Sequence, residues 1–133
     1  MAKLYRVFIS HSWDHVDALK RLRKMLENRG DFKVEFTEAS PENPIQSVKN
    51  KDIRMELRHR IEQSDIVLGI AGMYASYSDW MRWELNRAKE YHIPIIGIIP
   101  RGQKNISKVV SNRAKEKVRW NTESIVDAIR RNA

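Results

Sequence analysis

The stretch SDWMRWELNRAKE sets one carboxylate, Glu84, among indole side chains. Trp80 lies one helical turn before Glu84, and Trp83 directly precedes it. A carboxylate held against an indole surface is poorly solvated, so its field acts on a nearby cation with little screening. The pattern suits a site that stabilises positive charge, with Trp80 as a flat apolar wall.

Helical spacing indicates where Glu84 faces if residues 78–91 form a helix. The core stripe has the spacing i, i+4, i+7 and consists of Met81, Leu85 and Ala88. The adjacent stripe consists of Trp80, Glu84 and Arg87. Glu84 is therefore expected to border the core rather than point into water. In a second interpretation, Glu84 is a surface residue that pairs with Arg87 or Lys89, and the tryptophans only pack. For Trp83 we expect packing.

Other residue types offer less for chemistry. The sequence has four histidines, at positions 11, 15, 59 and 92. They show no metal-ligand spacing, so we expect no metal site. The sequence contains neither a phosphate-binding glycine loop nor a dinucleotide fingerprint. Ser10 and Ser12 lack a nucleophile elbow, and the first apolar run does not end in the acidic pair of a phospho-accepting receiver.

Apolar, β-branched runs alternate along the chain with helical patterns. Strands are predicted at 4–10, 32–36 (an edge strand), 65–72, 93–99 and 117–120. Helices are predicted at 11–30, around 53–61, at 78–91 and at 121–131. Wholly apolar strands that alternate with helices are typical of a parallel sheet covered on both faces. We expect an α/β, flavodoxin-like three-layer sandwich with a five-stranded parallel sheet of order 2-1-3-4-5.

The predicted helix ends carry residues that suit caps. Ser12 or Asp14 is expected to cap the start of the first helix, and Gly30 its end. Asn121 or Thr122 is expected to cap the start of the last helix.

Ligands of open parallel sheets bind outside the carboxyl ends of the strands, at the switch point between the first and third strands. The expected walls of this pocket are SHSWD after the first strand and AGMYASYSDW after the third. The polar stretch 37–50 is too long for a plain connector, and it is a candidate lid for this pocket.

The length predicts one domain over residues 1–133. No apolar run is long enough for a membrane span, the start is unlike a signal peptide, and the chain has no cysteine. These features indicate a cytoplasmic protein.

The net charge is +8, and residues 101–133 contribute +6 of it, with nine Lys or Arg and three Asp or Glu. Aromatic residues are not interleaved with these charges, so we expect a solvated basic surface rather than a nucleic-acid partner, although a phosphate-bearing ligand stays open.

The segments RVFISHSWDH and SDIVLGIAGMYASYSDWMRWEL resemble a TIR domain, namely its first strand with the following loop, and its third strand with the helix that bears a Trp-x-x-x-Glu motif. With the tail IPIIGIIPRGQKNIS…VRWNTESIVDAIR, nearly the whole chain resembles the TIR-like proteins of bacterial Thoeris antiphage defence. The 37–50 stretch departs from the pattern, because it has SPENP where TIR domains usually have a proline–glycine turn, a region that often joins protomers.

The resemblance implies an activity and its residues. The motif's glutamate is catalytic in TIR enzymes and maps onto Glu84, with Trp80 as the motif's tryptophan. The implied reaction cleaves the nicotinamide–ribose bond of NAD⁺, which is a substrate rather than a cofactor. Members of the Thoeris type then form a cyclic ADP-ribose isomer that signals to a separate effector NADase. A homo-oligomer on activation is also implied.

One carboxylate suits this chemistry, because the pyridinium leaving group needs no general acid and the oxocarbenium-like ribose needs a nearby anion. Around the end of the first strand, Phe8, Ser10, His11 and Trp13 are candidates for holding the substrate. Phe8 can equally belong to the core, and Trp13 can simply cover the helix start. Two other functions stay open, a non-enzymatic interaction module and an N-glycosidic enzyme similar to nucleoside deoxyribosyltransferases.

Overall fold

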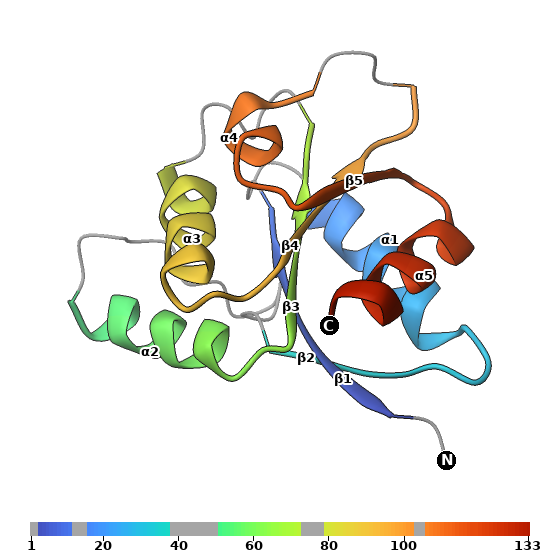
Figure 1. Ribbon diagram of the computed structural model, residues 1–133, viewed down its shortest axis with the longest axis horizontal. Helices are drawn as coiled ribbons and strands as arrows, with labels where there is room; N and C mark the ends of the chain where they lie inside the picture. Colours follow the sequence, from blue (N-terminus) through green and yellow to red (C-terminus); the bar gives the residue numbers. More distant parts are fainter. Residues whose placement is uncertain (1–2, 12–15, 38–50, 73–78, 103–105) are drawn as a thin grey trace.

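The computed structural model describes residues 3–11, 16–37, 51–72, 79–102 and 106–133. It contains one five-stranded sheet with helices on both faces (Figure 1). The strands are β1 (Leu4–Ser10), β2 (Lys33–Phe36), β3 (Ile66–Ile70), β4 (Ile95–Ile99) and β5 (Glu116–Arg119). The helices are α1 (Val16–Glu27), α2 (Lys51–Glu62), α3 (Asp79–Glu90), α4 (Lys108–Ser111) and α5 (Thr122–Asn132).

The strand order is β2-β1-β3-β4-β5, and all neighbouring strands are parallel. This confirms the predicted flavodoxin-like order and the edge position of β2. The register aligns Ser10 of β1 with Gly69 of β3, and Gly69 with Gly97 of β4. Three small residues therefore lie side by side across the centre of the sheet.

Successive side chains of a strand point to opposite faces of the sheet, so each strand contributes to two apolar layers. Val7 and Ile9 of β1 lie in one layer with residues of α1 and α5. Phe8 lies in the other layer, with residues of α2, α3 and α4. Figure 1 shows the same division, with α1 and α5 on one side of the sheet and α2, α3 and α4 on the other. The site on α3 is thus built against the second layer.

The first strand is less buried than its apolar run predicts. Residues 4–6 are exposed or half-buried, and Leu4 is 46% exposed. The reason is that β3 pairs with β1 only from Val7 onward, so the beginning of β1 has a neighbour on one side alone. From Val7 to Ser10 the strand is fully buried, as expected.

The end of α1 corrects the prediction for Gly30. The helix ends at Glu27, where its apolar stripe ends with Leu26, and Gly30 does not have a positive φ. Asp31 instead takes the left-handed conformation, with φ 56°, which a short polar side chain tolerates. The alternatives for the start of α1, Ser12 and Asp14, lie outside the described residues.

The C-terminal part holds one confirmed cap and one helix that was not predicted. Asn121 accepts a 3.0 Å hydrogen bond from the backbone N–H of Ser124, as an N-cap residue does. The unpredicted helix is α4, in a stretch that we expected to be only a basic surface. Its Val109 and Val110 are buried against the sheet. None of the helices in the described parts of the chain is long and apolar enough to cross a membrane.

Candidate functional site

The last residues of β1 place polar groups at the carboxyl end of a buried strand. Ser10 follows Phe8 by two residues, so both side chains face the layer under α3. Phe8 and Ser10 have no exposed surface, and His11 is 5% exposed. In this structure Phe8 is a core residue, the second of its two predicted roles, and its contact with a substrate stays a prediction. Trp13 lies outside the described residues.

Helix α3 turns its apolar stripe to the same layer. Met81, Leu85 and Ala88 are fully buried, as predicted. The neighbouring stripe, with Trp80 and Glu84, is half-buried, which confirms that Glu84 borders the core. Trp80 packs on the partly buried edge of this core. An indole and a carboxylate one turn apart are thus presented together at the boundary between core and water.

A hydrogen bond joins these two elements. The buried hydroxyl of Ser10 donates to Oε1 of Glu84 over 2.9 Å. The backbone of Ser10 is fixed because it lies at the end of a buried strand. The hydrogen bond from its hydroxyl therefore restricts the position of the carboxylate oxygen. The structure therefore brings together Ser10 and Glu84, two of the residues that the sequence proposes for the site.

The neighbouring residues Trp83 and Arg87 have structural partners. Arg87 lies over the ring of Trp83, 5.5 Å from its centroid, and forms a 3.3 Å ion pair with Glu90. Arg58 of α2 approaches the same ring at 5.9 Å. Trp83 also packs against the second apolar layer, so the expectation of packing for it is confirmed.

Glycines under the site let the helices come close to the sheet. A Cβ on Gly69 would lie 3.3 Å from Val110 and 3.6 Å from Leu85. A Cβ on Gly97 would lie 3.1 Å from Val110. These glycines were not among the predicted site residues, although each lies inside an otherwise apolar run, which is a signal for close packing.

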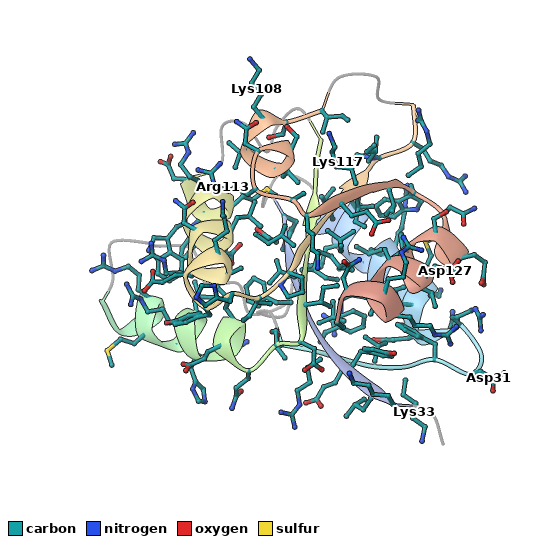
Figure 2. The ribbon with its side chains drawn as sticks, in the orientation of Figure 1. Asp31, Lys33, Lys108, Arg113, Lys117 and Asp127 are labelled. Carbon is teal, nitrogen blue, oxygen red and sulfur yellow. The ribbon has the colours of Figure 1, made fainter. Side chains whose placement is uncertain are left out.

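A second connection ties α4 to α3. Arg113, just after α4, donates from Nε to Oδ1 of Asn86 over 2.7 Å and from Nη1 to the carbonyl of Val109 over 3.0 Å. Figure 2 shows Arg113 between the two helices, while Lys108 projects away from them. Since Asn86 follows Glu84 by two residues, Arg113 supports the part of α3 that carries the carboxylate.

Within the described ranges, no group of three or more His, Asp or Glu is placed to hold a metal ion.

The strand order, the two helical layers and the Trp80–Glu84 helix define a TIR-like protein of the flavodoxin-like class. The chain belongs to the family described as Thoeris protein ThsB, TIR-like domain, whose model matches residues 8–105. The matched part includes the end of β1, α3 and the Ser10–Glu84 pair.

Solved structures share this fold at low sequence identity. A 2-deoxyribosyltransferase from Bacillus psychrosaccharolyticus is 17% identical, with a TM-score of 0.64 and coverage of 92% of this chain and 90% of that chain. The CMP N-glycosidase BcmB of Clostridium botulinum is 13% identical, with a TM-score of 0.56 and coverage of 96% and 99%. The TIR domains of the activated Roq1 resistosome are 17% identical, with a TM-score of 0.53 and coverage of 74% and 59%. These likenesses establish the fold. No curated protein matches the chain in sequence.

Proposed function

We propose that the protein cleaves the nicotinamide–ribose bond of NAD⁺ with Glu84 as the catalytic carboxylate. In this proposal it converts the ADP-ribosyl part into a cyclic ADP-ribose-type signal in a Thoeris-like antiphage response. Membership of the ThsB TIR-like family supports the class of reaction. The observation that carries the proposal is the hydrogen bond from Ser10 to Glu84, which holds the motif's carboxylate at the carboxyl end of β1.

The proposed reaction needs one bond to break. The bond between C1′ of the ribose and the pyridinium nitrogen breaks, and its electron pair moves to the nitrogen, so nicotinamide leaves neutral. The positive charge develops on the ribose as an oxocarbenium-like centre. A fixed carboxylate stabilises that charge most when its position is set before the reaction, because no reorganisation is then needed. Ser10 supplies this restraint for Glu84.

Product formation decides between hydrolysis and cyclisation. Water can add to C1′ and lose a proton, which gives ADP-ribose. For cyclisation, a nucleophile of the ADP-ribosyl part itself adds and loses its proton, which requires a folded-back substrate and exclusion of water. We assign Trp80, whose indole is partly buried beside Glu84, to the wall that excludes water.

We propose roles in substrate binding for the remaining predicted residues. His11 directly follows Ser10 in the chain, and we assign it to holding substrate next to the Ser10–Glu84 pair. Phe8 and Trp13 stay predictions for the same task. Downstream, the cyclic product is proposed to signal to a separate effector NADase, and the protein is proposed to form a homo-oligomer on activation.

A second candidate function is N-glycosidic transfer on deoxynucleosides. It is favoured by the fold shared with a 2-deoxyribosyltransferase and a CMP N-glycosidase over more than nine tenths of this chain. Both reactions need a carboxylate near an anomeric carbon, so Glu84 is central to either.

One experiment separates these functions. The purified protein is incubated with NAD⁺, or with a deoxynucleoside and a second base, in the presence and absence of lysate from phage-infected cells. The products are then separated by chromatography. Nicotinamide with a cyclised product supports the proposal, whereas base exchange on the deoxynucleoside alone supports the second candidate. Turnover of neither substrate under any condition contradicts both and leaves a non-enzymatic interaction module.

A further inference from the structure

The structure has a hollow away from the Ser10–Glu84 pair. It has a volume of about 410 Å³ and is formed by α1, by the residues after β4 and by the residue after β5. Its lining residues are Arg21, Lys24, Met25, Asn28, Arg101 and Trp120. An adjoining hollow of about 160 Å³ shares Arg21, Arg101 and Trp120 with it. Two of the three lining segments follow the carboxyl ends of strands, the edge where open parallel sheets bind ligands.

The described residues that line this hollow carry uncompensated positive charge. Arg21, Lys24 and Arg101 contribute three positive charges, and no described acidic residue lines it. In the part of the chain that the structure describes, none of these three cations forms an ion pair, although arginines elsewhere do, such as Arg29 with Glu123. Converging like charges repel one another, and an anion between them relieves that repulsion. The hollow is therefore built to attract a multiply charged anion.

The hollow also offers an aromatic surface. Trp120 is partly buried and packs against the apolar layer of α1 and α5, so its ring is held in place while part of it stays accessible. Its backbone N–H bonds the carbonyl of Ile99 over 3.0 Å, which continues the pairing of β4 with β5. A fixed indole is a platform for a flat ring such as a nucleobase. Asn28 adds an amide that can both donate and accept hydrogen bonds.

This hollow is separate from the site of Glu84. Ala18, Met25 and Trp120 pack against the layer of α1 and α5, whereas Trp80 packs against the opposite layer. Figure 1 shows α1 and α3 on opposite sides of the sheet. A ligand in the hollow therefore does not touch the Ser10–Glu84 pair.

We propose that this hollow binds a nucleoside diphosphate, with the phosphates between Arg21, Lys24 and Arg101 and the base on Trp120. The volume lies within the roughly 300–1,000 Å³ of small-molecule sites. The charges explain the phosphates, and the indole explains why the ligand carries a ring. This site does not depend on the proposed NAD⁺ cleavage.

The test is the affinity for ADP and for inorganic pyrophosphate, measured by titration calorimetry. Arg21→Ala and Arg101→Ala are each expected to weaken ADP binding by at least about tenfold, as loss of a charge-assisted hydrogen bond does. Trp120→Leu is expected to weaken ADP binding but to leave pyrophosphate binding unchanged. Circular-dichroism melting verifies that each variant is folded, and the two arginine variants carry the test if Trp120→Leu is not.

Two controls make the result specific. Lys33→Ala removes a cation of β2 that is not among the residues lining the hollow, and it is expected to leave ADP binding unchanged. Lys108→Ala, at the start of α4 and not among the residues that line the hollow, is expected to do the same. The proposal is overturned if the protein binds no ADP, if Arg21→Ala and Arg101→Ala bind it like wild type, or if Lys33→Ala weakens binding as much as they do. Tighter binding of single-stranded oligonucleotides than of ADP would also overturn the assignment to a mononucleotide.

Discussion

The hydroxyl of Ser10 donates a 2.9 Å hydrogen bond to Oε1 of Glu84, although the two residues are 74 positions apart in the chain. Ser10 has no exposed surface, and Glu84 lies at the boundary of the core. A hydrogen bond to a charged group contributes roughly 1.5–3 kcal/mol, more than one between neutral groups. The bond thus ties the position of a carboxylate on α3 to the end of β1.

Ser10→Ala is expected to reduce nicotinamide release from NAD⁺ by about tenfold or more, because Glu84 loses the donor that positions it. The loss should appear mainly in kcat, since a positioning defect acts on the chemical step. Steady-state kinetics with chromatographic detection of nicotinamide measures it.

A matched control is Ser64→Ala. Ser64 is also buried, and its hydroxyl lies 2.6 Å from Oγ1 of Thr37 and donates to the carbonyl of Arg60 over 2.9 Å. It is expected to lower stability, by about 1 kcal/mol, without lowering kcat. Equal rates for Ser10→Ala and wild type would show that the hydrogen bond has no part in the reaction.

Much of the fold follows from short-range patterns in the sequence. Strands β3 and β4 are continuous apolar runs, and such runs occur where a parallel sheet is covered on both faces. The spacing of Met81, Leu85 and Ala88 likewise predicts which side of α3 is buried. These features depend on residues close together in the chain, so they can be recognised without knowing what packs against them.

Features that depend on distant segments could not be predicted in the same way. The sequence named Ser10 and Glu84 separately, but their contact depends on how α3 packs against β1. Helix α4 has four residues, too few for a helical period to show. The basic hollow brings Trp120 together with Arg21 and Lys24 of α1. The basic residues that precede Trp120 in the sequence have no aromatic residue among them, so the local pattern did not indicate this site.

Gly97→Ala is expected to destabilise the protein by about 1–3 kcal/mol. The new methyl group would lie 3.1 Å from Cγ1 of Val110 and 3.3 Å from Cγ of Lys117. Val110 is fully buried and β-branched, so it cannot turn aside easily. Urea denaturation measures the loss.

Gly30→Ala provides the comparison for this change. A Cβ at Gly30 meets nothing within 4 Å, and Gly30 does not have a positive φ. The substitution is expected to be neutral or to stabilise by up to about 1 kcal/mol, because alanine restricts the unfolded chain. If Gly97→Ala were as stable as Gly30→Ala, the close packing of α4 on the sheet would not limit the size of the side chain at position 97.

Stability should depend on pH through Glu116. A hydrogen bond from Asn132 and then the charge and hydrogen bond of Arg131 lower the pKa of Glu116 from its ordinary value of 4.5. The folded pKa is thus below the unfolded one, so the stabilisation is present above the unfolded value and is lost as the pH falls through the folded pKa. Glu116→Gln should therefore lower the free energy of unfolding near neutral pH but not in strong acid.

Urea denaturation of wild type and Glu116→Gln across this pH range tests the prediction. Glu27→Gln serves as the control, because the carboxylate of Glu27 forms no ion pair within the described ranges. A difference between Glu116→Gln and wild type that stays constant from neutral pH to strong acid would refute the assigned role of the Asn132 and Arg131 contacts.

The most direct test of the proposed reaction is the rate of nicotinamide release by Glu84→Gln. Glutamine keeps the shape of the side chain and an oxygen that can accept the hydrogen bond of Ser10, but it removes the negative charge. The proposal predicts a loss of at least about a hundredfold, because the positive charge on the ribose loses its stabilising anion. Glu90→Gln, on the same helix, should release nicotinamide at the rate of wild type. Wild-type release by Glu84→Gln would contradict the catalytic role of this carboxylate.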